Sequence, residues 1–425
     1  MKLYLQPEKK DWPELMLRPV MDMSALETVV NNILDAVKTE GDEALKRYTQ
    51  QFDRAEIAML EVSEQEFFEA EKVLEEDLKA AIRLAKENIE VFHSRQKETV
   101  EVIETMPGVR CWRKSVAIEK VGLYIPGGTA PLFSTVLMLG VPAALAGCRE
   151  VVLCSPPLAD GTVHPAILFA AQHAGIQKVY KVGGVQAIGA MAYGTESIPA
   201  VYKIFGPGNQ YVTCAKQLVQ RGGISIDMPA GPSEVLVCAD HSANPDFVAA
   251  DLLSQAEHGA DSQVVLLAFE EKMVQQVMAS MERQLESLPR RDIAQAAMAN
   301  SLAVVLQTRS DATDFINDYA PEHLILSVED ANAFSAGIVN AGSVFLGHFT
   351  PESAGDYASG TNHTLPTNGF ARTYSGVSLD SFVKKITFQE ITREGLERLG
   401  PAVMCMAEAE DLTGHSRAVG VRLEA

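Results

Sequence analysis

Two successive series of short, β-branched runs, with helix-like stretches between the runs, constrain this fold more than any other feature of the chain. The first series has strand-like runs at residues 121–125, 151–155, 178–183 and 201–206. The second series has such runs at residues 234–240, 262–269, 302–307 and 343–347. Short apolar strands that alternate with helices form parallel sheets covered by helices on both faces. The sequence therefore predicts an α/β protein with two doubly wound, Rossmann-like units.

Helical segments are expected on both sides of these series. Apolar residues at three- and four-residue spacing predict a helix from Ser24 and a second long helix from about Ser63 to Phe92. The tail from about Tyr374 is expected to be helical and to end in an extended piece at residues 419–423. The predicted organisation has four parts: an N-terminal arm of residues 1–24, a main α/β domain of residues 25–123 with 234–373, a second α/β domain of residues 124–233, and a C-terminal tail of residues 374–425.

Composition and charge exclude several classes of protein. The chain has 425 residues, enough for two or three hydrophobic cores, and no apolar run of 18 residues. A membrane span and a secretory signal are therefore not expected, and a cytoplasmic location is. The formal net charge is −20 with no basic stripe, which disfavours nucleic-acid binding. The six cysteines form no CxxC pair, so we expect buried thiols and neither disulfides nor zinc ligands.

Three glycine-containing turns follow strand-like runs of the first series. They lie in the segments GLYIPGGTAPL at residues 122–132, VGGVQAIGA at 182–190 and FGPGNQYV at 205–212. Each turn alone is equally consistent with a plain strand-to-helix connection, because none has the GxGxxG spacing. Together they indicate a ligand site, since such turns cluster at the carboxyl ends of parallel strands and bring backbone amides close to a phosphate.

Polar residues in the second series have competing interpretations. The segment IDMPAGPSE at residues 226–234 fits either a hinge between the two units or the lining of a cleft. Gln255 and His258 share one helical face, and by spacing alone they are ordinary surface or core residues. Adjacent Glu322 and His323 fit either a solvated helix end or a pair of proton acceptors in a cleft.

The densest polar stretch is PESAGDYASGTNHTLPTNG at residues 351–369, which contains Asp356 and His363. No core could be built from these residues, and a long ordered loop in a compact enzyme is usually functional. Glu410 and His415 lie in the tail, where isolated polar residues are mostly exposed and without function.

Taken in order, six blocks of this sequence resemble the histidinol dehydrogenase family. The blocks are GLYIPGGTAPL, IDMPAGPSE, QAEHG, PEHL, SGTNHTLPT and EDLTGH, and the resemblance extends from about Ser24 to Leu423. It implies an enzyme of histidine biosynthesis that uses two NAD to oxidise L-histidinol through the aldehyde to L-histidine. One small departure is Asp411, where the family commonly has glycine.

The resemblance also implies roles for individual residues. It implies one zinc per subunit, bound by Gln255, His258, Asp356 and His415. It implies NAD contacts at Tyr124, Gln186 and Asn209. It implies substrate contacts at Ser233, His363 and Glu410, in a site shared with His323 and the four zinc ligands. Family members are homodimers whose tail enters the partner's site, so Glu410 and His415 are expected to serve the neighbouring subunit.

The chemistry of this reaction suits the implied residues. His323 is the expected general base for both oxidation steps, and Glu322 is expected to activate the water that adds to the aldehyde. Zinc would orient the substrate through its imidazole and amine nitrogens. Two alternatives are weighed. A related dehydrogenase acting on a sulfonated diol is disfavoured by acidic Glu410, and a nonenzymatic zinc- or nucleotide-binding protein is disfavoured by the intact Glu322–His323 pair.

Overall fold

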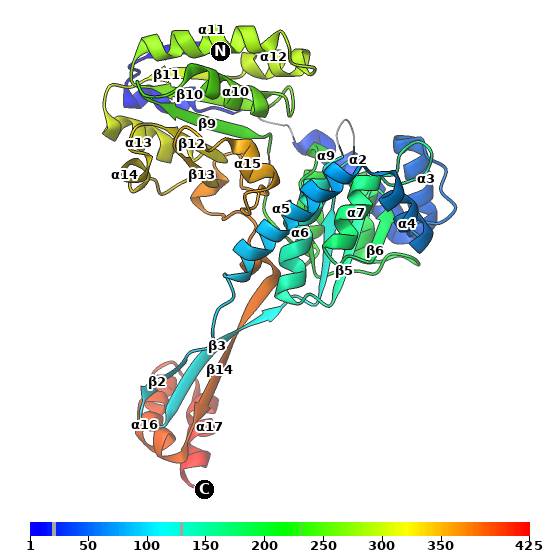
Figure 1. The fold of residues 1–425 in the computed structure, drawn as a ribbon. Coiled ribbons are helices and arrows are strands. Elements are labelled where there is room, and N and C mark those ends of the chain that lie inside the picture. Colours follow the sequence, from blue (N-terminus) through cyan, green and yellow to red (C-terminus); the bar gives the residue numbers. More distant parts are fainter. Residues whose placement is uncertain (19–22, 128–130, 230) are drawn as a thin grey trace.

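The structure, a computed structural model, describes residues 1–18, 23–127, 131–229 and 231–425. It contains two α/β units, each built on its own sheet, and a long antiparallel ribbon that extends away from both (Figure 1). The predicted fold class, with two doubly wound units of parallel strands and helical segments at both ends of the chain, is confirmed. Within the described ranges, no helix combines the length and apolar character needed to cross a membrane.

One unit is built on a six-stranded sheet in which every pair of neighbours is parallel. Its strands in spatial order are β1 (Lys2–Leu5), β11 (Leu302–Val305), β10 (Gln263–Ala268), β9 (Glu234–Ala239), β12 (His323–Ser327) and β13 (Ser343–Leu346). The central strands β9, β10 and β12 are buried along their whole length. Burial on both faces explains why these strands read as continuous apolar runs in the sequence.

Helices cover both faces of this six-stranded sheet. One face packs on α10 (Pro245–Ala256), α11 (Glu271–Leu285) and α12 (Arg291–Ala299). The opposite face packs on α1 (Trp12–Leu15), α13 (Arg309–Tyr319) and α14 (Ala331–Ser335). Alternate residues of β9 contribute to the two cores, Val235 and Val237 to one and Leu236 and Cys238 to the other.

The second unit has a five-stranded parallel sheet. Its strands in spatial order are β6 (Lys178–Lys181), β5 (Glu150–Ser155), β4 (Lys120–Tyr124), β7 (Lys203–Phe205) and β8 (Ser225–Ile226). The chain first adds strands on one side of β4 and then crosses to the other side, so a topological switch lies between β4 and β7. Ligands bind beyond the carboxyl ends of the strands at such a switch.

Eight helices among the described residues enclose the five-stranded sheet. One core contains α6 (Phe133–Ala146) and α7 (Pro165–His173), with α4 (Glu64–Val73) and α5 (Glu76–Ser94) packed over them. The other core contains α8 (Gly184–Tyr193) and α9 (Gln210–Arg221), with α2 (Met23–Glu40) and α3 (Asp42–Asp53). The expected grouping of residues 25–123 with residues 234–373 differs from this packing, because α2 to α5 cover the five-stranded sheet.

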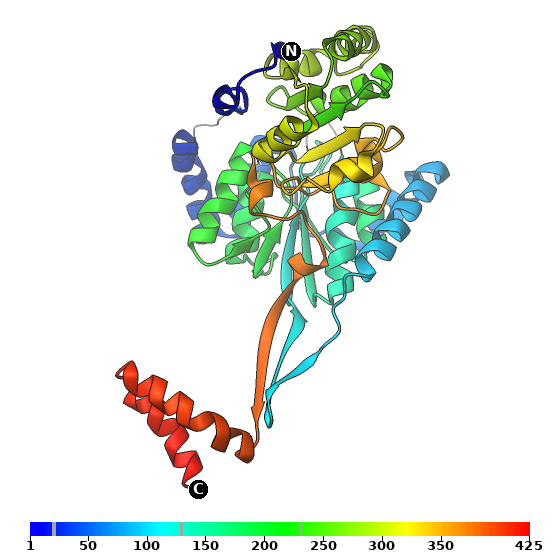
Figure 2. The same ribbon diagram turned by 90° about the vertical axis from the view of Figure 1, so that its left-hand side faces the viewer.

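A three-stranded antiparallel ribbon carries the C-terminal tail away from both units (Figures 1 and 2). Its strands are β2 (Val102–Met106), β3 (Val109–Ala117) and β14 (Val383–Ile391), and β3 pairs with both of the others. Beyond the ribbon, α16 (Arg393–Ala409) and α17 (Thr413–Leu423) pack against each other. The short α15 (Glu352–Tyr357) lies in the polar loop that follows β13.

Three local expectations were wrong. The helix predicted from Ser63 to Phe92 is two helices, because Leu74 and Glu75 adopt extended backbone between α4 and α5. Residues 383–391, expected to be helical, form β14 because they pair with β3 over nine residues. Residues 419–423, expected to be extended, continue α17, where Val419 and Leu423 pack against Gly400 of α16. In the last case a tertiary contact overrides the local preference of β-branched residues, whereas in β14 the pairing agrees with that preference.

Cysteines and the N-terminal arm complete the comparison with expectation. All six cysteines are free thiols, of which three are buried and Cys405 is exposed. The N-terminal arm, which shows no periodicity, contributes β1 as an edge strand paired with β11. Arg18 binds the arm to the unit with the six-stranded sheet. Its Nε lies 2.5 Å from Oε2 of Glu234, and its Nη2 donates to the carbonyl oxygen of Tyr319 at 2.7 Å. The charge of Glu234, 2% exposed, is thereby paired.

Arg18→Met should destabilise the protein strongly, because it removes the partner of a buried carboxylate. The expected loss is about 3–5 kcal/mol, the usual consequence of leaving a buried charge unpaired. Lys9→Met is the matched control, since Lys9 also ties the arm to the same unit through the exposed Asp314. Urea unfolding followed by circular dichroism should show a much lower midpoint for Arg18→Met alone. Equal midpoints for the two variants would show that the Arg18 pair does not stabilise this unit.

Candidate active site

His323 is the first residue of β12, the second strand from one end of the six-stranded sheet. Its register places it beside Val235 of β9 on one side and Ser343 of β13 on the other. The imidazole is 3% exposed, and Nδ1 lies 3.2 Å from the carbonyl oxygen of Glu234. Because two neighbouring strands fix its backbone, the ring is held in one place.

Glu322 immediately precedes His323 and is also buried, at 6% exposure. Its Oε2 accepts a hydrogen bond of 2.9 Å from the backbone N–H of Glu234 and lies 3.5 Å from Nδ1 of His323. The dipeptide is therefore not a solvated helix end. Both side chains lie in the same buried pocket of the sheet edge.

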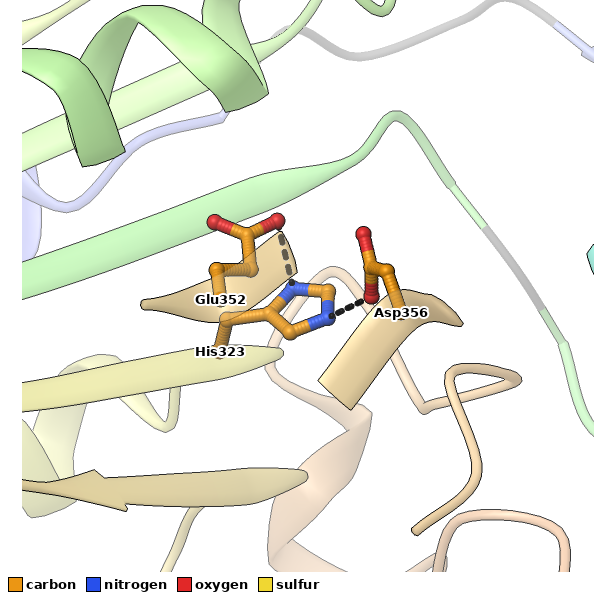
Figure 3. Close-up of side chains that lie close together, drawn as sticks. All are labelled: His323, Glu352 and Asp356. Carbon is orange, nitrogen blue, oxygen red and sulfur yellow. Dashed lines mark ion pairs between the residues drawn. The ribbon is translucent and has the colours of Figure 1, made fainter. Parts of the chain in front are cut away.

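Two further carboxylates approach His323 from α15, as Figure 3 shows. Glu352 and Asp356 are four residues apart on this short helix and so share one face. Oε1 of Glu352 lies 3.8 Å from Nδ1 of His323, and Oδ1 of Asp356 lies 3.5 Å from Nε2. One ligand atom from each of the three side chains lies within 4.8 Å of the others. This set of residues is called the His323 cluster below.

The electrostatics of the His323 cluster are dominated by unbalanced negative charge. Burial by itself lowers the pKa of His323, but the charges of Glu352 and Glu322 and the contact with Asp356 raise it well above the usual value. Burial raises the pKa of Glu352 well above that of a free carboxyl. Burial also acts to raise the pKa of Asp356, yet its contacts with His323 and the nearby His363 and His258 leave it lowered. Such a site favours a cation.

Some polar atoms of the cluster lack partners. Within the described part of the chain, neither Nε2 of His323 nor Oε2 of Glu352 has a hydrogen-bond partner, although both are buried. Gln255, fully buried in the last turn of α10, faces the same carboxylate. With its amide oriented to suit its neighbours, Nε2 donates to Glu352 and Oε1 accepts from the N–H of Glu234 at 3.0 Å. Unpartnered buried atoms of this kind mark a place where a ligand binds.

The polar loop of residues 351–369 contacts both units. Nδ1 of His363 lies 2.8 Å from the carbonyl oxygen of Asp356, and Nε2 lies 3.0 Å from the hydroxyl of Thr135 at the start of α6. Asn362 donates to the carbonyl oxygen of Met138 at 2.6 Å. His363 therefore lies beside the His323 cluster and also contacts the unit that carries the five-stranded sheet. Burial lowers its pKa, which favours the neutral ring.

Ser233 and His258 line a polar cavity of about 510 Å³, together with Asn209. Ser233 immediately precedes β9, and His258 follows α10 by two residues and is exposed. The cavity lies between the two units, because Asn209 begins α9 of one unit whereas Ser233 and His258 belong to the other. In the segment of residues 226–234, which connects β8 to β9, residues 231–233 line this cavity, and residue 230 lies outside the described residues.

The three predicted NAD contacts line one larger cavity of about 660 Å³ at the carboxyl ends of the five-stranded sheet. We call it the cofactor cavity. Tyr124 ends β4, and its hydroxyl accepts a 3.1 Å hydrogen bond from the N–H of Gly184. Gln186 lies in the first turn of α8, and Asn209 caps α9 by accepting from the N–H groups of Tyr211 and Val212. Asn209 lines both cavities, so the two adjoin there.

The turn before Asn209 depends on a glycine and a buried ion pair. Gly206 has φ +127°, and a Cβ atom there would lie 2.0 Å from the carbonyl oxygen of Tyr124. Only glycine permits this close approach of the β7 turn to the end of β4. Lys216 donates to the carbonyl oxygen of Gly206 at 2.8 Å and pairs with Asp227, whose Oδ2 accepts from the N–H of Gly206 at 2.8 Å.

Two predicted site residues are not brought to the cluster within one chain. Glu410 ends α16 and His415 lies in α17, both exposed on the helical pair beyond the ribbon. That helical pair lies far from the two α/β units in both views (Figures 1 and 2). In this chain the site therefore contains Gln255, Glu322, His323, Asp356 and His363, with Ser233 and His258 in the adjoining polar cavity.

Sequence reasoning missed Glu352, Glu234 and Asp53. Glu352 could have been found from its four-residue spacing to Asp356, which places both carboxylates on one helical face. Glu234 reads as the first residue of an apolar strand, and no local signal shows that it pairs with Arg18, 216 residues away. Asp53 lines the cofactor cavity from the end of α3, and nothing in its neighbourhood in the sequence marks it.

Comparison with known proteins agrees with this geometry. The profile of the family described as histidinol dehydrogenase matches residues 16–423. The chain is 60% identical to the histidinol dehydrogenase of Bacteroides fragilis, covering all of this chain and 99% of the relative. It is 52% identical to the chloroplastic enzyme of Arabidopsis thaliana, covering 96% and 88%. The crystal structure of histidinol dehydrogenase from Elizabethkingia anophelis superposes with a TM-score of 0.98 at 55% identity, covering 100% and 98%. The resemblance read from the sequence is confirmed, and the chain belongs to the histidinol dehydrogenase family of oxidoreductases.

Proposed function

We propose that the protein is an NAD-dependent histidinol dehydrogenase that oxidises L-histidinol through its aldehyde to L-histidine. One observation carries this proposal: the buried Glu322 and His323 contact the backbone of Glu234, and the preceding residue, Ser233, lines a polar cavity that shares Asn209 with the cofactor cavity. Membership of the family supports the same substrate. The alternative substrate, a sulfonated diol, is disfavoured because its anion would meet Glu322, Glu352 and Asp356. The cytoplasmic location stays a prediction.

Zinc fits the residues that surround the His323 cluster. Gln255, His258 and Asp356 offer an amide oxygen, an imidazole and a carboxylate, a mixed oxygen and nitrogen set that zinc accepts. Two observations support a cation there, namely the excess of carboxylates and the unpartnered Oε2 of Glu352. Zinc, when bound, would hold the imidazole and amine nitrogens of the substrate in a fixed orientation. His415 of a second subunit would complete the set.

His323 is the proposed general base of both oxidation steps. In the first step it accepts the hydroxyl proton of the alcohol while hydride leaves the carbon. In the second step it accepts a proton from the hydrated aldehyde. The surrounding carboxylates raise the pKa of His323 while no cation faces them, and a cation bound beside them would act in the opposite direction. Occupation of the site by a cation thus favours the neutral ring that a base requires.

Glu322 is proposed to activate the water that adds to the aldehyde. Its Oε2 is anchored by the N–H of Glu234, which fixes the carboxylate beside His323. Because the two residues are adjacent at the end of β12, they can act on one reacting carbon without moving the backbone. Asp356, and Glu410 of a second subunit, would attract the cationic amine.

The tail is proposed to enter the site of a partner in a homodimer. The ribbon and its terminal helices expose large apolar side chains in this single chain: Ile103, Phe388, Ile391, Met406 and Leu412 are 37–65% exposed. An extended ribbon with such a surface is expected to be covered by another subunit. Exchange of the tail would bring Glu410 and His415 to a cluster that lacks them in one chain.

Substitution at the Glu–His pair tests the division of roles. His323→Ala should lower the rate of both steps by roughly 10²- to 10⁴-fold, the range for loss of a general base. Glu322→Gln keeps an acceptor for the N–H of Glu234 and should slow aldehyde oxidation more than alcohol oxidation. Single-turnover NADH formation from histidinol and from its aldehyde measures each step separately.

His348→Asn is the matched control for His323→Ala. His348 contacts Ser327 at the opposite end of β12, at 2.9 Å, and lies outside the site. Its substitution should leave both rates near those of the wild type. Equal loss of both steps in Glu322→Gln would contradict the water-activating role, and an active His323→Ala would contradict the proposal for the base.

His415→Asn should lower the zinc content per subunit, because it removes one proposed ligand. Elemental analysis of the purified, dialysed protein measures the loss. His241→Asn is the control. The His241 side chain is also exposed, at 68%, but it lies beyond the carboxyl end of β9, whereas the site lies at the amino end of that strand. Full metal content in His415→Asn would remove this residue from the ligand set.

Subunit mixing tests the exchange of the tail. His415→Asn and His323→Ala each inactivate every site of their own homodimer. If the tail crosses over, a mixed dimer regains one intact site, so random mixing should restore about a quarter of wild-type activity. Absence of recovery in verified mixed dimers would show that each site is built within one chain.

A further inference from the structure

The cofactor cavity contains three polar side chains without partners. Within the described residues, the buried side-chain polar atoms of Ser155 and Gln186 have no hydrogen-bond partner, and neither has Oδ2 of Asp53. Ser155 is fully buried and Gln186 is 1% exposed. Leaving such groups unpaired costs free energy that a bound ligand can recover. The cavity is therefore built for a ligand that offers several hydrogen bonds.

Asp53 differs from Ser155 and Gln186 because it comes from a helix that precedes all five strands of the sheet in the chain. It is the last residue of α3, and Arg54, with a left-handed φ of +58°, ends the helix and turns the chain away. The negative charge of Asp53 acts on the hydroxyl of Tyr124 and contributes to raising that pKa, after the larger effect of burial. Asp53 and Tyr124, the last residue of β4, line the same cavity.

Among its described residues, the lining of the cofactor cavity carries a negative charge and no lysine or arginine to balance it. Asp53 is the only acidic residue among the described lining residues, and these include no lysine or arginine. In many doubly wound nucleotide-binding units, an acidic side chain at the end of the second strand accepts the ribose hydroxyls. Here the second strand, β5, ends in Ser155 and is followed by Pro156. The usual position of the acid is thus occupied by a serine.

Apolar side chains at the rim indicate which part of a dinucleotide lies near Asp53. Val29, Phe52 and Leu158 line the cavity and are 49%, 52% and 44% exposed. Phe52 stacks on Tyr48 with ring centroids 5.6 Å apart, which holds its ring in place. A purine would cover this apolar rim. The nicotinamide end would then point toward Asn209, where the polar cavity begins.

We infer that Asp53, supplied by the N-terminal helices, accepts hydrogen bonds from the adenosine ribose of the cofactor and excludes a cofactor with a 2′-phosphate. This inference rests on the proposed assignment of the cofactor cavity to NAD. A ribose diol gives the carboxylate two donors, whereas a 2′-phosphate would place like charges together in a cavity that lacks a cation to separate them.

Titration of the full-length protein with NADH and with NADPH, followed by nucleotide fluorescence, tests the inference. Asp53→Asn should weaken NADH binding by roughly 10- to 100-fold, as expected for a hydrogen bond to a charged group. NADPH binding should weaken less or improve, so the ratio of the dissociation constant for NADPH to that for NADH should fall by about tenfold or more. Asp35→Asn, an exposed aspartate of α2 outside the cavity, is the matched control and should change neither constant.

Misfolding can be separated from loss of the contact. Burial raises the pKa of Asp53 to about 6. Because this pKa is higher in the folded than in the unfolded state, protonated Asp53 contributes to the stability of the fold. That contribution is lost as the pH rises through the folded-state pKa, so the charged carboxylate opposes folding at pH 8. The ligand-free Asp53→Asn variant should therefore melt no lower than wild type at pH 8. Asp53→Ser provides a second variant, which also removes the charge.

Gln186→Ala distinguishes failure of the inference from failure of the proposed cofactor site. It should weaken NADH and NADPH alike, because an uncharged amide has no charge that would repel a 2′-phosphate. Weak binding in Gln186→Ala with unchanged binding in both Asp53 variants would overturn the role of Asp53 and leave the cavity as the cofactor site. Unchanged NADH binding in all three variants would overturn both. Equal weakening of the two nucleotides by Asp53→Asn would overturn the discrimination against phosphate.

Discussion

Burial of three carboxylates around one imidazole is the interaction on which the rest of the site depends. Glu322, Glu352 and Asp356 each lie within 3.8 Å of a ring nitrogen of His323, at the amino end of a fully buried strand. Charges so placed are costly unless they are paired. Backbone and side-chain donors offset part of this cost. The negative charge that stays unpaired favours the binding of a cationic substrate or a metal. The buried carboxylates lower the stability of this edge of the sheet and attract a cation to it.

The two sheets contribute opposite ends to the region between the units. The six-stranded sheet contributes the amino ends of β9 and β12, where Ser233, Glu322 and His323 lie. The five-stranded sheet contributes the carboxyl ends of its strands, where glycine-containing turns and helix starts surround the cofactor cavity. Asn209 lines the cavities on both sides, and His363 joins the units through Thr135. A hydride acceptor and a proton acceptor can thus be held on different units and still meet at one carbon.

Much of the fold was visible in the sequence, for a local reason. The central strands of both sheets are buried on two faces, so each appears as a short apolar run, and all eight predicted runs coincide with strands. The ribbon escaped detection because few of its residues are buried, and because β14 pairs with β3 across more than 260 positions of the chain. The N-terminal strand β1 was missed for a similar reason, since a four-residue edge strand has too few positions to show a pattern.

By itself, the sequence determined the family, eight strands of the two sheets, and the glycine turns, because these depend on neighbouring residues and on motifs read in order. Only the tertiary structure decided which polar residues share a site. It brought Glu352 and Glu234 to His323, placed Asp53 in the cofactor cavity, and left Glu410 and His415 beyond the ribbon. The physical reason is that burial and charge pairing join residues hundreds of positions apart, and no local periodicity records which distant side chain will neutralise a buried charge.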